Sequence, residues 1–222
     1  MKKVILLFIC ILMISDTTNI VDVKKSMLTP ESSVLHSQTE EGFQLHNPIN
    51  IHSDQELAEA GYPGEGTKES PYIIEEFKIN SDETCISIEE TRKHLIIRNC
   101  ILVSENEIDI TPIINFVDVE NVNILNCTFK GKLVYLEITR SMNGAIENSS
   151  MLGETNSIQI HHSSVYTISN NFYPETSAGI INLYDSDNIE IRDHYENGPT
   201  YISGSDSSYC TIRNNILFKK DV

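Results

Sequence analysis

Polar side chains that could hold a ligand recur in the C-terminal half of the chain at a spacing of 22 or 23 residues. They carry amide, carboxylate, imidazole and phenol groups, all of which take part in hydrogen bonds. If this spacing is one coil of a stacked chain, successive groups lie about 4.8 Å apart, which suits the hydroxyls of a regular polymer. The sequence therefore predicts a glycan-binding or polymer-binding edge, formed by Glu137, Gln159, His161, His162, Asn182, Tyr184 and Asp185.

Catalysis on the same edge is the alternative. A polysaccharide lyase needs a base and carboxylates that hold Ca²⁺, and a glycosidase needs two carboxylic acids at a set separation. The candidates are Glu137, Arg140 and Asp185, but their spacing singles out no carboxylate pair. A solvated face is a third interpretation, since outward strand positions must be polar in any case. We therefore expect non-catalytic binding, with an enzyme as the alternative.

A copper site would use the adjacent histidines His161 and His162, because Cu(II) prefers imidazole ligands. Alternation along a strand sends their two rings to different sides. The chain has no Cys-x-x-Cys motif and no Met-rich run that would suit Cu(I). We expect no cofactor, with Ca²⁺ or copper as the alternatives.

An internal repeat must position these residues. Its anchor is an isoleucine, and successive anchors stand 21 to 27 residues apart, at Ile74, Ile97, Ile124, Ile146, Ile168, Ile191 and Ile212. Around the anchors apolar and polar residues alternate, which is typical of strands with one buried face. Stacked coils bury their inward side chains in one column, which a single coil cannot do. The sequence therefore predicts an all-β fold, a single-stranded right-handed parallel β-helix of about seven coils of roughly 22 residues.

Asparagine marks one corner of the predicted coil, two positions after the anchor. It stands there in five of seven coils, as Asn99, Asn126, Asn148, Asn170 and Asn214. Asn tolerates left-handed backbone, and its amide can bond to the Asn above and below. We expect a buried stack of asparagines. Two of them begin glycosylation sequons, Asn126-Cys127-Thr128 and Asn148-Ser149-Ser150, and burial would leave both unmodified.

Cys100 and Cys127 occupy the same repeat position on consecutive coils. Their Cα atoms would lie about 5 Å apart, within the range of a disulfide bond. Two stacked buried thiols are the alternative. Cys210 precedes its anchor by two residues, an inward position, and is expected to pack as a small core residue.

The two ends of the chain differ from the repeat. Met1-Lys2-Lys3 and the eleven apolar residues that follow are typical of a secretory signal, with an uncleaved anchor as the alternative. Residues 1–25 are therefore the predicted signal peptide or anchor, 26–46 a polar linker, and 47–222 the β-helix domain, with a cap over 47–70 and coils over 71–222. In the cap, the capping box Ser53-Asp54-Gln55-Glu56 predicts a short helix that presses Leu57 and Ala60 on the column and ends at Gly61. The expected location is secreted, extracellular, periplasmic or cell-surface.

Composition narrows the choice of partner. The formal net charge of −16 disfavours a nucleic-acid backbone, because phosphate binding needs clustered Lys and Arg. Charged residues make up 22% of the chain and apolar residues 40%, which argues against a polytopic membrane protein and against a disordered chain. We expect a polysaccharide or cell-surface polymer as partner, and no nucleic acid.

One segment resembles a known class. The stretch from Asn47 to Asn80, with Ala60-Gly61-Tyr62-Pro63-Gly64-Glu65-Gly66-Thr67 and Ser70-Pro71-Tyr72-Ile73-Ile74-Glu75, resembles the N-terminal segment of secreted prokaryotic right-handed parallel β-helix repeat proteins. This class includes NosD-type periplasmic proteins and the carbohydrate-binding and sugar-hydrolase β-helices of pectate-lyase-like fold. The resemblance covers roughly residues 47 to 217 and implies the fold, with copper-site maturation as a further alternative function. The C-terminal end has no evident cap, so we expect it to be frayed, self-associated or covered by another protein.

Overall fold

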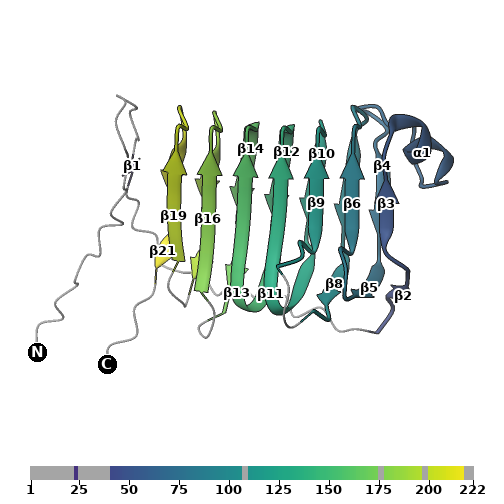
Figure 1. Ribbon diagram of the computed structural model, residues 1–222, viewed down its shortest axis with the longest axis horizontal. Helices are drawn as coiled ribbons and strands as arrows, with labels where there is room; N and C mark the ends of the chain where they lie inside the picture. The colour runs from purple at the N-terminus through teal and green to yellow at the C-terminus, as the bar shows by residue number, and fades with distance from the viewer. Residues whose placement is uncertain (1–22, 25–40, 107–109, 175–177, 197–199, 218–222) are drawn as a thin grey trace, which may run out of the picture.

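The protein is a parallel β-solenoid of about six turns. The computed structural model describes residues 23–24, 41–106, 110–174, 178–196 and 200–217. The coils stand side by side along one axis, with the only helix of the described residues at one end (Figure 1). Most of the predicted leader, the linker up to residue 40 and residues 107–109, between the anchors Ile97 and Ile124, lie outside the described residues.

Each coil contributes strands to three faces, which we call A, B and C. Face A consists of β4 (Tyr72–Glu75), β7 (Leu95–Arg98), β10 (Val122–Leu125), β12 (Met142–Glu147), β14 (Ser164–Ser169), β17 (Glu190–Arg192) and β20 (Thr211–Arg213). Face B consists of β2 (Gln44–Leu45), β5 (Phe77–Ser81), β8 (Ile101–Ser104), the first parts of β11 (Thr128–Thr139) and β13 (Ser150–His161), then β15 (Phe172–Tyr173), β18 (Tyr195–Glu196) and β21 (Ile216–Leu217). Face C consists of β3 (Ile49–Ile51), β6 (Ile86–Glu89), β9 (Ile114–Val117), the second parts of β11 and β13, then β16 (Ala178–Tyr184) and β19 (Thr200–Ser205).

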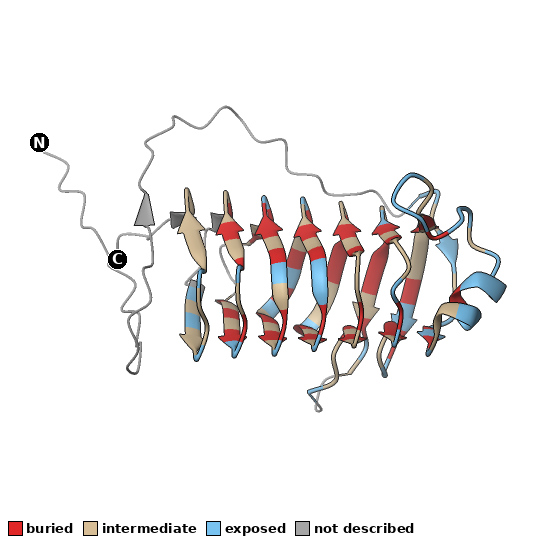
Figure 2. Cartoon of the chain, turned by 90° about the horizontal axis from the view of Figure 1, so that it is seen from above, coloured by how far each residue is buried: buried red, intermediate tan, exposed pale blue. Residues whose placement is uncertain are grey.

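The predicted repeat register is confirmed. On face A the seven anchor isoleucines pair in sequence, each with the anchor of the next coil. Six of them are fully buried, and Ile212 in the last coil is half-buried against the core. Buried and exposed residues alternate along the strands, so the apolar side chains fill the interior of the solenoid (Figure 2). This column is the main source of stability, because burial of each aliphatic side chain contributes about 2 kcal/mol.

The corner between faces A and B has the predicted left-handed backbone. All seven residues two positions after the anchors have a φ between 51° and 59°: Glu76, Asn99, Asn126, Asn148, Asn170, Asp193 and Asn214. A side-chain bond between corner asparagines joins Asn126 Nδ2 to Asn99 Oδ1 at 2.6 Å. The expected burial is wrong for Asn148 and Asn170, which are exposed, while Asn99 and Asn126 are half-buried. A residue with positive φ at a convex corner turns its side chain toward solvent, which the sequence pattern does not reveal.

The buried polar stack at this corner is one residue further along the chain. Ser149 Oγ accepts the backbone N–H of Cys127, and Asn171 Oδ1 accepts that of Ser149. Asn215 Oδ1 likewise accepts the N–H of His194. Each of these side chains satisfies a backbone group of the coil before it, which an apolar residue would leave unpaired.

Cys100 and Cys127 lie in the same stack, on neighbouring coils and buried. The structure has the second of the two alternatives, since all four described cysteines are free thiols. The side-chain hydrogen bond with Cys127, together with hydrogen bonds to the backbone, lowers the pKa of the Cys100 thiol. Burial raises the pKa of the Cys127 thiol. Cys210 is half-buried and packs against the core, as the sequence predicts.

The corner between faces C and A contains a second buried stack, formed by serines. The Oγ atoms of Ser141, Ser163, Ser186 and Ser207 each accept the backbone N–H of the equivalent residue one coil earlier, at 3.0 to 3.2 Å. Each hydroxyl also donates to a carbonyl two residues before it. This stack satisfies the backbone groups of the corner and fixes the backbone path from face C to face A.

Val165 is strained at this corner. Its φ is +57°, and it occupies the position at which the coils before and after have Asn143 and Asn188. A β-branched side chain is disfavoured in left-handed backbone, whereas Asn tolerates it. Val165 is also half exposed, so little packing offsets the strain.

We expect Val165→Asn to raise the free energy of unfolding by about 1 kcal/mol, because it relieves this backbone strain. Urea denaturation followed by circular dichroism measures the change. Val117→Asn is the matched control, since Val117 lies in strand β9 outside the positive-φ positions. The interpretation is wrong if Val165→Asn is no more stable than the parent protein.

The predicted cap helix is present as α1 (Asp54–Glu59). Ser53 Oγ accepts the backbone N–H of Glu56, as in a capping box, but the Glu56 carboxylate accepts from His52 instead of from Ser53. Leu57 is fully buried on the end of the column, whereas Ala60 is exposed, so the expectation for Ala60 is wrong. The helix ends at Glu59 after six residues, and Ala60 is its C-cap. Ala60 therefore lies outside the part of the helix that packs on the core.

Two short strands extend the solenoid beyond the predicted coils. β2 falls within the predicted linker, yet Gln44 and Leu45 pair in parallel with β5. At the opposite end, β1 (Val23–Lys24) pairs in parallel with β20. No helix among the described residues has the length and apolar content to cross a bilayer.

Candidate functional site

Face C displays an unbroken row of polar residues, which we call the polar ladder. Each rung pairs in register with the next across the strands that run from β3 to β19 (Figure 1). The rungs are Asn50, Ser87, Asn115, Glu137, Gln159, Asn182 and Ser203. Inward-facing residues flank each rung within its strand, so the rungs take outward positions, because side chains alternate between the two faces of a strand. Six of the rungs are half-buried or exposed, whereas Ser87 is buried. Glu137, Gln159 and Asn182 pair in register at outward strand positions, as the repeat spacing predicts.

Hydrogen bonds between neighbouring rungs order both ends of the ladder. Asn115 Nδ2 donates to Ser87 Oγ at 3.2 Å, and Ser203 Oγ donates to Asn182 Oδ1 at 2.6 Å. In the middle, burial and the adjacent carboxylate of Glu137 raise the pKa of the Tyr135 phenol. The ladder is therefore a partly ordered array of donors and acceptors, with one carboxylate among neutral groups.

A second outward row lies beside the ladder and consists of Thr139, His161, Tyr184 and Ser205 in register. The rings of His161 and Tyr184 stack with their centroids 4.7 Å apart and their planes 13° apart. His161 Nε2 also lies 3.2 Å from Gln159 Oε1 on the ladder. Aromatic and amide groups on neighbouring coils thus meet, as the sequence predicts.

A third outward row borders the ladder on its other side. Its members are Tyr135, Ser157, Ile180 and Tyr201. Tyr135 and Ser157 are buried, whereas Tyr201 is 61% exposed. Sequence reasoning missed this row because it lies at the start of the strands, where the alternation of apolar and polar residues is weak. Two further tyrosines, Tyr184 and Tyr209, are exposed on the same C-terminal coils. Aromatic surface is therefore concentrated at that end of the described solenoid.

His162, Arg140 and Asp185 do not lie on an outward strand position, contrary to the sequence prediction. Their φ values are +50°, +49° and +46°, and each is the first residue after a strand of face C. The same holds for Asp118 and Asp206. Each of the three directly follows an outward residue, so strict alternation would point it inward. Instead the strand ends there, and the positive φ turns the exposed side chain out at the corner.

Ion pairs occupy most of these corner residues. Arg140 donates to both carboxylate oxygens of Asp118, at 2.9 and 2.8 Å. These hydrogen bonds hold the pKa of Asp118 below its usual range. His162 Nδ1 lies 2.9 Å from Asp185 Oδ2. The structure therefore does not bring Glu137, Arg140 and Asp185 together: Arg140 is bound to Asp118, and Asp185 lies two coils from Glu137.

A metal site needs several ligands within reach of one ion. Among the residues that the structure describes, no group of three or more His, Cys, Asp and Glu side chains is arranged to hold one. The two candidate copper ligands are separated, since His161 stacks on Tyr184 while His162 pairs with Asp185 at the corner. Neither histidine is thus joined by a second ligand of the soft or imidazole type.

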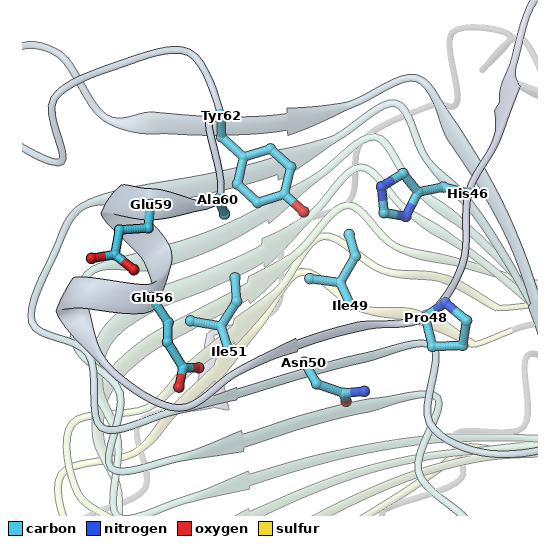
Figure 3. A pocket seen from close by; sticks show the side chains of 9 residues that line it. All are labelled: His46, Pro48, Ile49, Asn50, Ile51, Glu56, Glu59, Ala60 and Tyr62. Atoms are coloured by element: carbon cyan, nitrogen blue, oxygen red, sulfur yellow. The ribbon is translucent and has the colours of Figure 1, made fainter.

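A pocket of about 390 Å³ lies at the capped end of the solenoid, away from most of the ladder (Figure 3). Its lining residues are His46, Pro48, Ile49, Asn50, Ile51, Glu56, Glu59, Ala60 and Tyr62. The two carboxylates already accept hydrogen bonds, Glu56 from His52 and Glu59 from Gln55. The pocket shares only Asn50 with the polar ladder, so it does not enclose the predicted site.

The serine stack is the other feature that sequence reasoning missed. A signal was present, because a serine stands five residues before four successive anchors, at Ser141, Ser163, Ser186 and Ser207. These serines fix the corner from which Arg140, His162 and Asp185 project. Periodic polar residues therefore marked internal hydrogen-bonded stacks as well as the outer surface.

No family model, no curated protein and no solved structure matches this chain.

Proposed function

We propose that the chain is a secreted or cell-surface module that binds a glycan, or another repetitive polymer, along the polar ladder of face C without cleaving it. The observation that carries the proposal is the coincidence of two kinds of groups on neighbouring coils. Gln159 and Asn182 supply amides on the ladder, and His161 and Tyr184 supply a stacked aromatic pair directly beside it. Sugar rings present both apolar faces and hydroxyls, so such a surface offers a match for each.

The repeat of the surface supports a polymer as the ligand. Polar rungs recur at each coil, about 4.8 Å apart, and the four successive rungs from Asn115 to Asn182 are all half-buried, with Ser203 exposed after them. A small molecule would use one or two rungs, whereas a polymer that lies along the solenoid axis contacts many weak sites at once. Linked contacts of this kind add up to useful affinity even when each is weak.

Binding without cleavage is supported by the way the reactive groups are engaged. Arg140 is held by Asp118, and Asp185 is paired with His162. A general acid or base must reach the substrate with a free proton-transfer atom. Glu137 is the one carboxylate among the seven rungs of the ladder, whereas glycoside hydrolysis uses a pair of carboxyl groups.

The test is native electrophoresis in gels that contain dissolved polysaccharides, in which a bound protein migrates more slowly. We expect retardation by at least one polymer and a roughly tenfold weaker affinity for the Gln159→Ala/Asn182→Ala variant, since two hydrogen-bonding rungs are lost. Asn123→Ala is the matched control, because Asn123 is a half-buried outward residue of face A.

Two results would contradict the proposal. Equal weakening by Asn123→Ala would place the binding surface elsewhere or make it non-specific. Release of new reducing ends or unsaturated ends from the polymer would show that the protein is an enzyme.

A further inference from the structure

The aromatic stack beside the ladder ends abruptly at a small residue. One face of the Tyr184 ring is covered by His161, whose centroid is 4.7 Å away. The next residue of the row, on the other side of Tyr184, is Ser205. A serine side chain is too short to cover a phenol ring, and Tyr184 remains 39% exposed. The outer face of the ring is thus open at the level of the last described coil.

The open position has the size of one ring. Successive coils are about 4.8 Å apart, so a ring placed over Ser205 would contact Tyr184 at the distance at which His161 contacts it from below. His161 shows that this row accommodates a flat ring in that orientation.

Hydrogen-bonding groups surround the open position. Asn182 and Ser203 border it on the ladder side, joined by the Ser203 Oγ to Asn182 Oδ1 bond of 2.6 Å. This bond uses the Asn182 oxygen and leaves Nδ2 as a donor. On the corner side, Asp185 follows Tyr184, and the exposed Asp206 follows Ser205 and accepts its hydroxyl at 3.0 Å. A ligand here meets one amide donor and two carboxylate acceptors around an aromatic face.

The charges restrict the chemistry of the ligand. Two carboxylates on a chain of net charge −16 repel phosphates and uronic acids. The basic side chains nearest this corner are engaged, since the His162 ring contacts Asp185 and the Arg140 guanidinium is bound to Asp118. A ligand rich in hydroxyl donors, with an apolar face and without negative charge, fits these groups.

We infer that the outer face of Tyr184 above Ser205 is a subsite for one uncharged pyranose ring, which stacks on Tyr184 and donates hydroxyl hydrogen bonds to Asp185 and Asp206. The inference rests on the proposed function and adds the class of sugar and the ring-binding position. It places the strongest contact of the polymer at the C-terminal coils, where the other exposed tyrosines also lie.

The test fills the subsite with a side chain of the protein. In Ser205→Tyr the new ring continues the stack and occupies the outer face of Tyr184. We expect at least a tenfold loss of affinity for neutral hexasaccharides, such as cellohexaose or chitohexaose, measured by isothermal titration calorimetry. Ser205→Ala should bind as the parent protein does. Thr139→Tyr is the matched control, because it extends the same stack at its other end, against His161.

A second pair of variants tests whether a loss of affinity comes from the missing ring or from misfolding. Tyr184→Ala should lose affinity and Tyr184→Phe should retain it, because stacking needs the ring and not the hydroxyl. All variants are compared by circular dichroism and thermal melting. The chain contains no Trp, so quenching of tyrosine fluorescence reports ring contact directly.

The outcomes separate this inference from the proposed function. Unchanged hexasaccharide affinity in Ser205→Tyr, with loss in Gln159→Ala/Asn182→Ala, overturns the subsite and leaves the proposed function intact. Preference for oligogalacturonate over the neutral sugars overturns the uncharged class. Absence of binding to every polysaccharide in the gels overturns the proposed function itself, and the subsite with it.

Discussion

Lowering the pH from 7 to 4 is expected to remove about 3 kcal/mol from the free energy of unfolding through His194 alone. The imidazole is 1% exposed and lies in the buried polar stack at the corner between faces A and B. Its Nε2 donates to the carbonyl of Ile168 at 3.1 Å, and this hydrogen bond by itself raises the pKa of the ring. Burial is the main cause that lowers its pKa to about 4.

The sign follows from proton binding. The folded-state pKa lies below the usual 6.5, so the unfolded chain takes up the proton first as the pH falls. The stability from the neutral ring is complete above pH 6.5, declines between 6.5 and 4, and changes little below 4. Asp118 and Glu190 are carboxyl groups with lowered pKa values. They also reduce the free energy of unfolding, but only once the pH falls below the usual pKa of a carboxyl group.

His194→Asn is the matched variant, because Asn171 and Asn215 occupy the same position in the neighbouring coils. An Asn amide can donate to the Ile168 carbonyl and does not titrate. Urea denaturation of both proteins at pH 7.0, 5.5 and 4.5 should show a steeper loss in the parent. Equal loss in the two proteins would show that His194 is not the cause.

Gly144→Ala is expected to lower the free energy of unfolding by about 3 kcal/mol. Gly144 lies inward on face A, in register with the fully buried Tyr166 of the next coil. A Cβ atom at Gly144 would lie 2.2 Å from Tyr166 Cε1 and 2.8 Å from the Val122 carbonyl oxygen. The ring is enclosed and the backbone is fixed by strand pairing, so neither can move without breaking other contacts.

The matched control is Gly204→Ala, at another position of the repeat strands. A Cβ atom there would meet only Ser207 Cβ, at 3.9 Å, so the change should be nearly neutral. The double variant Gly144→Ala/Tyr166→Leu should be more stable than the sum of the two single costs predicts, because the smaller side chain leaves room for the methyl group. Strict additivity would refute a direct clash between the two residues.

Much of the fold could be predicted from the sequence. The anchor isoleucines, the alternation around them and the asparagines after them predicted a parallel β-solenoid, its register and one of its left-handed corners. The pairing of His161 with Tyr184 and of Glu137 with Gln159 followed directly from the register. These features depend on periodicity, because residues one repeat apart in the sequence become neighbours in a solenoid.

The candidate site could be predicted only where it lies within strands. The ladder rungs were placed correctly, whereas Arg140, His162 and Asp185 were assigned to an outward row and lie at the corner instead. Alternation distinguishes inward from outward positions inside a strand, but it does not reveal where the strand ends. The exact residue at which the backbone turns depends on contacts of the serine stack beneath it.

By itself, the sequence determined which residues of successive coils become neighbours, because a recurring pattern of anchors brings equivalent positions together even where the repeat length varies. Only the tertiary structure decided which polar residues are buried and which are exposed. Asn148 and Ser149 are adjacent and equally polar, yet Asn148 is exposed and Ser149 is buried. The reason is that burial of a polar group depends on whether the neighbouring coil presents a backbone partner for it, and that partner is known only once the coils are stacked.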